Sequence, residues 1–286
     1  MNSKYINGCR VCGNTKSTNK HIVDGFHIKQ CQHCSLLFVS DYLTSDDLKK
    51  YYKKDGVDPA YNDFENIDNL KWYYNKLRDL IENKKKGGRI LDVGCSAGHF
   101  LDVMYGWNRY GIEFDSEIAL KAEEKYGKNI HIGTLEDVVF QKGHFDVITL
   151  QDVLDHMIDP IVALNRCHQL LKPNGLIIVK VHNISCLYAK LTRSKFYAII
   201  PPFHLSFFNK KSLYEALIRA DFSPLFFKFI AHKIFIKTVF FRLAGTKRSG
   251  IFYKLYTWLE HLPLGNISFK KNLHDVITVF AVKKSH

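Results

Sequence analysis

The sequence predicts an α/β fold in which a mostly parallel seven-stranded sheet has helices on both faces and a small cysteine-bearing module precedes it. Three observations predict this. Strand-like and helix-like segments alternate along residues 89–185, which is typical of a parallel sheet. The run from Arg89 to Glu113 reads as strand, small-residue turn, helix and second strand. Two Cys-x2-Cys pairs lie close to the beginning of the chain.

The Arg89 to Glu113 stretch has the form of a nucleotide-binding unit. Its first strand, Arg89–Val93, runs into the small-residue turn Gly94-Cys-Ser-Ala-Gly98, and a helix follows. Such a unit presents backbone N–H groups to a ligand where its helix begins. The second strand ends at Glu113, nineteen positions after Gly94. An acidic residue in that place is positioned to accept hydrogen bonds from ribose hydroxyls.

The other elements follow from periodicity and from helix start and stop signals. Helices are expected over 44–52, 66–86, 116–126, 160–171, 209–220 and 252–259, and strands over 129–132, 145–150, 176–181, 222–230 and 274–283. Ligands of open parallel sheets bind beyond the carboxyl ends of the strands. The stretches that end there are Asp92–Gly98, Glu113, Leu135–Glu136 and Leu150–Asp152.

The expected domain organisation has three parts. Residues 1–43 form a zinc-ribbon module, 44–88 a helical segment, and 89–286 the main α/β domain. Within the last part, residues 184–208 contain Pro201-Pro202 and break the alternation, so they read as an insertion or lid. Residues 231–270 form a basic, aromatic segment.

Composition favours an ordinary folded protein. Of the 286 residues, 46% are hydrophobic and 24% charged. No secretory signal is visible near Met1, and no apolar run approaches the roughly 18 residues that a membrane-spanning helix needs. The expected location is therefore the cytoplasm. An odd number of cysteines, seven, argues against a disulfide framework.

The net charge of +13 is concentrated in the last third of the chain. Residues 186–286 carry 17 Lys+Arg against 4 Asp+Glu and hold 20 of the 39 aromatic residues. Basic and aromatic residues together suit an anionic small substrate, an anionic membrane surface or nucleic acid. A core filled by the aromatics and solvated by the lysines remains the alternative.

The N-terminal cysteines have the spacing of a four-thiolate zinc site. The pattern is Cys-x2-Cys-x18-Cys-x2-Cys, formed by Cys9, Cys12, Cys31 and Cys34. Between the two pairs, Ile22–Ile28 alternates around an Asp-Gly turn, which indicates a hairpin. With all four ligands supplied by cysteine, the Zn²⁺ is expected to be structural, because no coordination position stays open for chemistry.

Three hypotheses compete for the turn Gly94–Gly98. It is a nucleotide-cofactor loop, a nucleophile elbow with Ser96 in Gly-x-Ser-x-Gly, or a dinucleotide fingerprint. The fingerprint is disfavoured because His99 stands where its last glycine belongs. The elbow needs a later acid and histidine, for which Asp152 and His204 are available, but it leaves Asp92 and Glu113 without a role. The cofactor loop is favoured.

The string ILDVGCSAGHFL followed by YGIE resembles the class I S-adenosylmethionine-dependent methyltransferases, whose fold is Rossmann-like. The strings FDVITLQDVLDHMIDP, LLKPNGLIIVKV and FHLSFFNKKSLYEALIRADF are similar to the same family. The cysteine module resembles the zinc-binding addition of a subgroup that includes sugar C-methyltransferases. One departure is Ser96, which replaces a middle glycine often found in this loop, although a small residue still fits.

This resemblance implies a set of cofactor residues. Gly94, Ser96 and Gly98 let the backbone approach the methionine part of S-adenosylmethionine, and Asp92 acts near its amino group. Glu113 binds the ribose hydroxyls. The remaining contacts are assigned to Leu135 and Glu136, which flank the adenine, and to Gln151.

Transfer of a methyl group to a hydroxyl or carbon nucleophile also needs a general base. The first candidate is His204, on the expected lid, and the second is His156, after the fourth strand. The resemblance favours a nucleotide sugar or a polysaccharide or lipid-linked precursor as acceptor. Residues 226–258 suit peripheral contact with an anionic membrane at the inner membrane surface. An RNA methyltransferase, a hydrolase and a non-catalytic zinc- and cofactor-binding scaffold stay open as alternatives, as does the oligomeric state.

Overall fold

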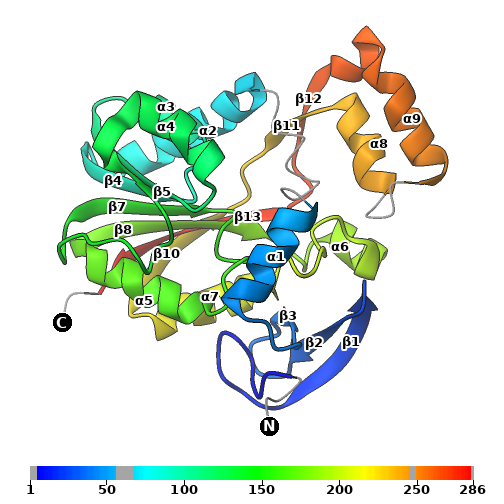
Figure 1. Ribbon diagram of the computed structural model, residues 1–286, viewed down its shortest axis with the longest axis horizontal. Coiled ribbons are helices and arrows are strands. Elements are labelled where there is room, and N and C mark those ends of the chain that lie inside the picture. Colours follow the sequence, from blue (N-terminus) through cyan, green and yellow to red (C-terminus); the bar gives the residue numbers. More distant parts are fainter. Residues whose placement is uncertain (1–4, 56–66, 245–248, 285–286) are drawn as a thin grey trace.

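A seven-stranded sheet forms the centre of the computed structural model, which describes residues 5–55, 67–244 and 249–284 (Figure 1). The strand order is β10-β13-β8-β7-β4-β5-β6. All neighbours are parallel except at β13, which runs antiparallel to both β8 and β10. The strands of this central sheet are β4 (Gly88–Val93), β5 (Trp107–Glu113), β6 (Ile130–Ile132), β7 (Phe145–Gln151), β8 (Leu171–His182), β10 (Phe222–Lys228) and β13 (Val276–Lys283).

Helices cover both faces of this sheet, as predicted: α2, α3 and α4 lie on one side, and α5 and α7 on the other (Figure 1). Successive residues of a strand point to opposite faces, so Ile90 packs among the residues of α2 and α3 while Leu91 packs with those of α5 and α7. The helices are α1 (Ser45–Asp55), α2 (Ile67–Glu82), α3 (His99–Val103), α4 (Ser116–Tyr126), α5 (Pro160–Leu170), α6 (Leu187–Thr192), α7 (Lys210–Arg219), α8 (Ile236–Ala244) and α9 (Gly250–Glu260).

Three of these helices begin at side-chain caps. The Asp115 carboxylate caps α4 by accepting hydrogen bonds from the N–H groups of Glu117 and Ile118. Asp159 caps α5 in the same way. At α7, Asn209 and Ser212 form a reciprocal capping box.

A second, four-stranded sheet has the order β1-β2-β3-β9 and is antiparallel throughout. Asp24 and Gly25, with φ of 48° and 86°, turn β1 into β2, which confirms the predicted hairpin. The strands are β1 (Ser17–Val23), β2 (Phe26–Cys31), β3 (Leu37–Val39) and β9 (Ser206–Phe207); a separate pair consists of β11 (His232–Phe235) and β12 (Ser268–Lys271).

The segment 184–208, read from the sequence as an insertion or lid, is built into this second sheet. It contains α6 and contributes β9, whose Phe207 pairs with Leu37 of β3. Phe196 and Leu205 are fully buried in one apolar cluster with residues of β2 and β3. The segment therefore belongs as much to the N-terminal module as to the main domain.

One element differs clearly from its expected bounds. β8 begins at Leu171, five residues before the expected start at Leu176. Leu171 pairs with Phe145 at the far end of β7, and the register then shifts between Phe145 and Val147. The turn residues Lys172–Gly175 follow the end of α5, as expected. They nevertheless lie inside β8, because pairing with β7 extends the strand through them. Within the described residues, no helix is long and apolar enough to cross a membrane.

Candidate cofactor and acceptor site

The carboxyl ends of β4, β5, β7 and β8 meet at one edge of the central sheet, because these strands are parallel neighbours. Asp92 is the second-last residue of β4, Glu113 ends β5, Gln151 ends β7 and His182 ends β8. All but His182 are buried. Buried acidic and amide groups need a polar partner, so this edge is the place to look for a ligand.

The loop after β4 has the backbone that its small residues allow. Gly94, Ser96 and Gly98 have φ of 72°, 48° and 80°, in the left-handed region. A Cβ on Gly94 would lie 2.5 Å from Cγ2 of Val153, and one on Gly98 would lie 2.8 Å from Cε2 of Tyr126. Only glycine both adopts a positive φ readily and lacks the Cβ for which there is no space at Gly94 and Gly98.

Glu113 is held by this loop. Its Oε2 accepts a hydrogen bond from the Ser96 N–H at 2.9 Å, and its Oε1 accepts one from the Asp115 N–H at 3.1 Å. Burial raises the pKa of Glu113, and these backbone donors act in the opposite direction. The carboxylate is thereby fixed between the Gly94–Gly98 loop and the residues that follow β5.

Asp92 and Gln151 form a buried polar pair beside it. Oδ1 of Asp92 accepts hydrogen bonds from Oγ1 of Thr149 at 2.5 Å and from Nε2 of Gln151 at 3.5 Å. Burial raises the pKa of Asp92 to about 7. Oε1 of Gln151 is buried and accepts no hydrogen bond from the part of the chain that the structure describes. An unsatisfied acceptor beside a buried carboxylate fits a ligand with an ammonium group, such as the methionine part of S-adenosylmethionine.

The predicted adenine contacts are divided between core and surface. Leu135 and Glu136 lie in the loop after β6. At the start of this loop, the Gly133 N–H donates to the Glu113 carbonyl at 2.8 Å. Leu135 is buried in the core on the α5 side of the sheet, whereas Glu136 is exposed. Of the two, only Glu136 presents its side chain to solvent at this edge.

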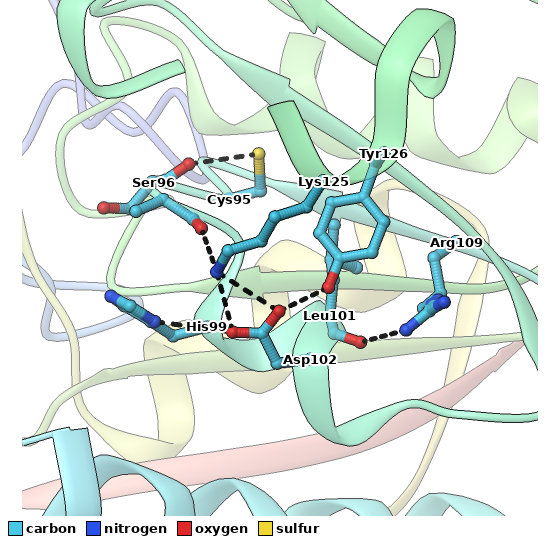
Figure 2. A network of polar contacts seen from close by, with 9 residues as sticks. Cys95, Ser96, His99, Leu101, Asp102, Arg109, Lys125 and Tyr126 are labelled. Carbon is cyan, nitrogen blue, oxygen red and sulfur yellow. Dashed lines mark hydrogen bonds and ion pairs between the residues drawn. The ribbon is translucent and has the colours of Figure 1, made fainter. Parts of the chain in front are cut away.

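A polar network fastens the loop to α4 (Figure 2). Nζ of Lys125 donates to the carbonyl of Ala97 at 3.3 Å and to Oδ2 of Asp102 at 2.9 Å. The Tyr126 hydroxyl donates to Oδ1 of Asp102 at 2.6 Å. Burial alone raises the pKa of Asp102, but the donors from Tyr126 and Lys125 hold it below its usual range. The carboxylate therefore stays charged and ties α3 to α4, and Lys125 of α4 also holds the loop that precedes α3.

The two predicted bases lie together in a cluster of histidines, which we call the histidine cluster: Asp155, His156, His182 and His204. The His156 and His204 rings are 4.4 Å apart between centroids and perpendicular. Oδ2 of Asp155 lies 3.4 Å from Nδ1 of His182 and 3.9 Å from Nε2 of His204. Although its burial acts the other way, His204 and His182 hold the pKa of Asp155 well below its usual range.

Asp155 and His182 were not among the residues singled out from the sequence. A signal for His182 was present, since it ends the strand that follows the Leu150–Asp152 stretch. Burial acts to lower the pKa of His182, but the Asp155 and Asp152 carboxylates raise it above its ordinary value. The side chain of His182 is 20% exposed, against 3% for Asp155 and His204, so it is the member of this trio most open to a ligand.

The hydrolase alternative does not match the hydrogen bonding. Its acid, Asp152, pairs instead with Nζ of Lys180 at 2.5 Å. Nδ1 of His204 lies 2.7 Å from the Ala198 carbonyl and donates to it. In a catalytic triad that nitrogen donates to the acid. Ser96 therefore lacks the oriented base that a nucleophile elbow requires.

The four N-terminal cysteines form one buried cluster. Their sulfur atoms all lie within 4.8 Å of one another, with 3.5 Å between Sγ of Cys9 and Cys34 and 3.4 Å between Sγ of Cys12 and Cys31. Four thiolates around a tetrahedral Zn²⁺ with bonds of about 2.3 Å have sulfur atoms about 3.8 Å apart. The cluster thus fits one tetrahedral metal ion without an open position.

Comparison with known proteins decides the family. A family model described as "Methyltransferase domain" matches residues 68–225, which is more than half of the chain. The chain belongs to this family. The predicted relationship to class I S-adenosylmethionine-dependent methyltransferases is thereby confirmed at the level of the domain.

The curated relatives cover a smaller part of this methyltransferase-family chain. It is 35% identical over 125 residues to a ubiquinone biosynthesis O-methyltransferase from Actinobacillus pleuropneumoniae serotype 7, across 38% of this chain and 53% of the relative. It is 29% identical over 132 residues to an uncharacterized methyltransferase from Schizosaccharomyces pombe, across 39% of this chain and 46% of the relative. The chain spans about half the length of the curated relatives that it matches.

Solved structures share the fold. One is the 1,6-didemethyltoxoflavin-N1-methyltransferase from Burkholderia thailandensis, with bound 1,6-didemethyltoxoflavin and S-adenosylhomocysteine. Its TM-score is 0.52 at 14% identity, covering 94% of this chain and 100% of that one. The YcgJ protein from Bacillus subtilis gives a TM-score of 0.52 at 17% identity, covering 74% of this chain and 100% of that one. At these identities the likeness shows the fold.

The cysteine cluster, which lies outside the matched residues 68–225, and the histidine cluster, which lies within them, are joined through β3 and β9. The Val39 N–H donates to the Leu205 carbonyl at 2.9 Å, and the N–H groups of Leu205 and Ser206 donate to the Asp155 carbonyl at 2.9 and 3.1 Å. Arg10, between two of the cysteines, donates to the carbonyls of Val39 and Ile158. His204 is therefore positioned between the N-terminal module and the loop after β7.

Proposed function

We propose that this protein transfers a methyl group from S-adenosylmethionine to an oxygen or carbon atom of a small anionic or sugar-type acceptor. The observation that carries the proposal is the pairing of two sites at one sheet edge of a methyltransferase domain. Buried Asp92 and Glu113 lie at the ends of β4 and β5. The histidine cluster lies beyond the adjacent strands β7 and β8.

The cofactor would be held by the residues that the sequence indicated. Glu113, already oriented by the Ser96 and Asp115 N–H groups, accepts hydrogen bonds from the ribose hydroxyls. Asp92 and Oε1 of Gln151 accept hydrogen bonds from the amino group. When bound, the cofactor supplies an electrophilic methyl group on a sulfonium. The chain's own task is to align the acceptor with that group, and alignment accounts for much of the rate enhancement.

Removal of the acceptor's proton is assigned to the histidine cluster. His204 and His156, the predicted bases, both belong to it, and a neutral imidazole can accept a proton on its unprotonated nitrogen. Asp155 is buried beside them and stabilises a positively charged imidazole ring. The cluster thus contains both a proton acceptor and a counter-charge.

The acceptor is proposed to be a small molecule. The curated relative is named for O-methylation in ubiquinone biosynthesis, which favours a small-molecule acceptor and oxygen as the methylated atom. The excess of 17 Lys+Arg over 4 Asp+Glu in residues 186–286 favours an acceptor with negative charge, such as a nucleotide sugar or a lipid-linked sugar.

Peripheral membrane contact through residues 226–258 stays a prediction. It is supported by exposed apolar side chains on α9, among them Ile251 at 65% and Trp258 at 58% exposure. Flotation with vesicles that contain anionic lipid checks it. A protein that stays with the soluble fraction at low salt contradicts the contact.

The first prediction concerns Glu113. Replacing it in Glu113→Ala removes a charged acceptor of two hydrogen bonds, each worth about 1.5–3 kcal/mol, so S-adenosylmethionine should bind at least about tenfold more weakly. Calorimetry on the full chain measures this. Glu117→Ala, an exposed substitution in the first turn of α4, should leave the affinity unchanged. Equal affinities for both variants would show that Glu113 is not the ribose ligand.

The second prediction concerns structural zinc, which we propose for the cysteine cluster. Cys31→Ser should remove the ion that Cys9, Cys12, Cys31 and Cys34 bind together and should lower the melting temperature. Elemental analysis counts the metal. The matched control is Cys186→Ser, because buried Cys186 lies outside the cysteine cluster and caps α6 by accepting a hydrogen bond from the Ala189 N–H, and serine caps as well. A Cys31→Ser protein with its full zinc content would refute the site.

The third prediction concerns the acceptor class. The protein is incubated with S-adenosylmethionine and separate pools of nucleotide sugars, lipid-linked sugars, phenolic quinone precursors and RNA. Mass spectrometry then shows which pool gains a methyl group. The proposal expects methylation in one of the three small-molecule or lipid-linked pools. Methylated RNA alone would replace the proposed acceptor class.

A further inference from the structure

Three side chains of the histidine cluster have the composition and spacing of a metal-binding site. One oxygen of Asp155, Nδ1 of His182 and Nε2 of His204 all lie within 4.8 Å of one another. Ligand atoms bound to the same ion through bonds of about 2.1 Å lie roughly 3–3.5 Å apart. The separation between Asp155 and His182 is already 3.4 Å and that between Asp155 and His204 is 3.9 Å, so only small rotations are needed.

His204 is oriented as a metal ligand usually is. Its Nδ1 donates to the Ala198 carbonyl at 2.7 Å, which leaves Nε2 as the nitrogen with a lone pair, on the side of Asp155. Histidines that bind metals nearly always donate their other ring N–H to a carbonyl or carboxylate, because this bond fixes the tautomer and the ring direction.

One oxygen of the Asp155 carboxylate has no hydrogen-bond partner among the described residues. Asp155 is 2% exposed, and this oxygen, Oδ1, accepts no hydrogen bond within the described ranges 5–55, 67–244 and 249–284. Nζ of Lys180 is paired with Asp152 at 2.5 Å. A buried carboxylate with a free oxygen is costly unless a cation or donor reaches it.

Two of the three proposed ligands, Asp155 and His204, are held in place by hydrogen bonds, and the third, His182, is partly exposed. Asp155 is tied through its carbonyl to the N–H groups of Leu205 and Ser206, and His204 is tied to Ala198. His182 is 20% exposed, so an ion here would keep coordination positions that face solvent. An ion with three protein ligands and open positions is typical of catalytic sites, whereas the closed cysteine cluster is typical of structural ones.

We propose that Asp155, His182 and His204 bind one divalent transition-metal ion beside the methyl-acceptor site. This rests on the proposed function and adds a second role for that site. Two imidazoles and one carboxylate suit ions such as Zn²⁺, Co²⁺ or Fe²⁺ rather than Mg²⁺ or Ca²⁺, which prefer oxygen ligands.

The ion changes how the acceptor is activated. An acceptor hydroxyl that binds at an open position loses its proton more readily, because the positive charge stabilises the oxygen anion. With Nε2 of His204 bound to the ion, the proton passes to His156, whose ring lies against that of His204. The oxygen then forms a bond to the methyl carbon as the carbon–sulfur bond breaks, and the sulfonium becomes a neutral thioether.

Metal counting tests the proposal without any acceptor. The full chain is dialysed against Zn²⁺, freed of loosely bound ion by gel filtration and analysed for metal. The wild type should hold about two ions per chain, one in each cluster. Asp155→Asn and His182→Ala should each hold about one. His261→Ala, a matched histidine substitution at an exposed position after α9, should hold two.

Loading with Co²⁺ identifies which ion is lost. Cobalt at the cysteine cluster gives thiolate charge-transfer absorption, which His182→Ala should keep, while the weaker bands of the histidine-bound ion should vanish. Binding of S-adenosylmethionine, measured on each variant, shows that the protein is folded. A folded wild type that binds the cofactor but only one ion overturns this inference and leaves the proposed function standing. A wild type that holds two ions but does not bind S-adenosylmethionine overturns the proposed function and leaves the metal site standing.

Discussion

The pairing of β3 with β9 is the contact on which the arrangement of the acceptor side depends. It joins Leu37 and Phe38, three residues after the last cysteine, to Phe207 and Ser206, two residues after His204. The backbone of that short strand continues into hydrogen bonds with the Asp155 carbonyl. An N-terminal module and a segment about 170 residues later in the chain therefore fix one histidine between them.

The cofactor side does not depend on that contact. Its loop is held by Glu113, by the steric demands at Gly94 and Gly98 and by Lys125 and its partners on α4, all within one strand–helix–strand unit. The acceptor side is assembled from the loop after β7, the end of β8, and β9. Under the proposed function, this separation would let the N-terminal module influence the choice of acceptor without altering the cofactor loop.

The sequence predicted the parts of this structure that rest on local patterns. The Cys9 to Cys34 spacing, the helix that begins at Pro160 and the turn at Asp24 are each recognised from a few neighbouring residues, and each is present. It did not predict that His182 meets Asp155. That contact arises from the register of β8 on β7 and from a two-residue strand, β9, which is too short to leave a periodic signal.

The central claim is that the cysteine module stabilises the region around His204 and Asp155 and does not affect the stability of the Gly94–Gly98 loop. Hydrogen exchange on the wild type and on Cys31→Ser tests it most directly. We expect the variant to exchange faster at the amides of Val39, Leu205 and Ser206, while the amides of β4 and the Gly94–Gly98 loop keep their protection. Unchanged exchange at Leu205 and Ser206, or an equal increase along β4, would contradict the account.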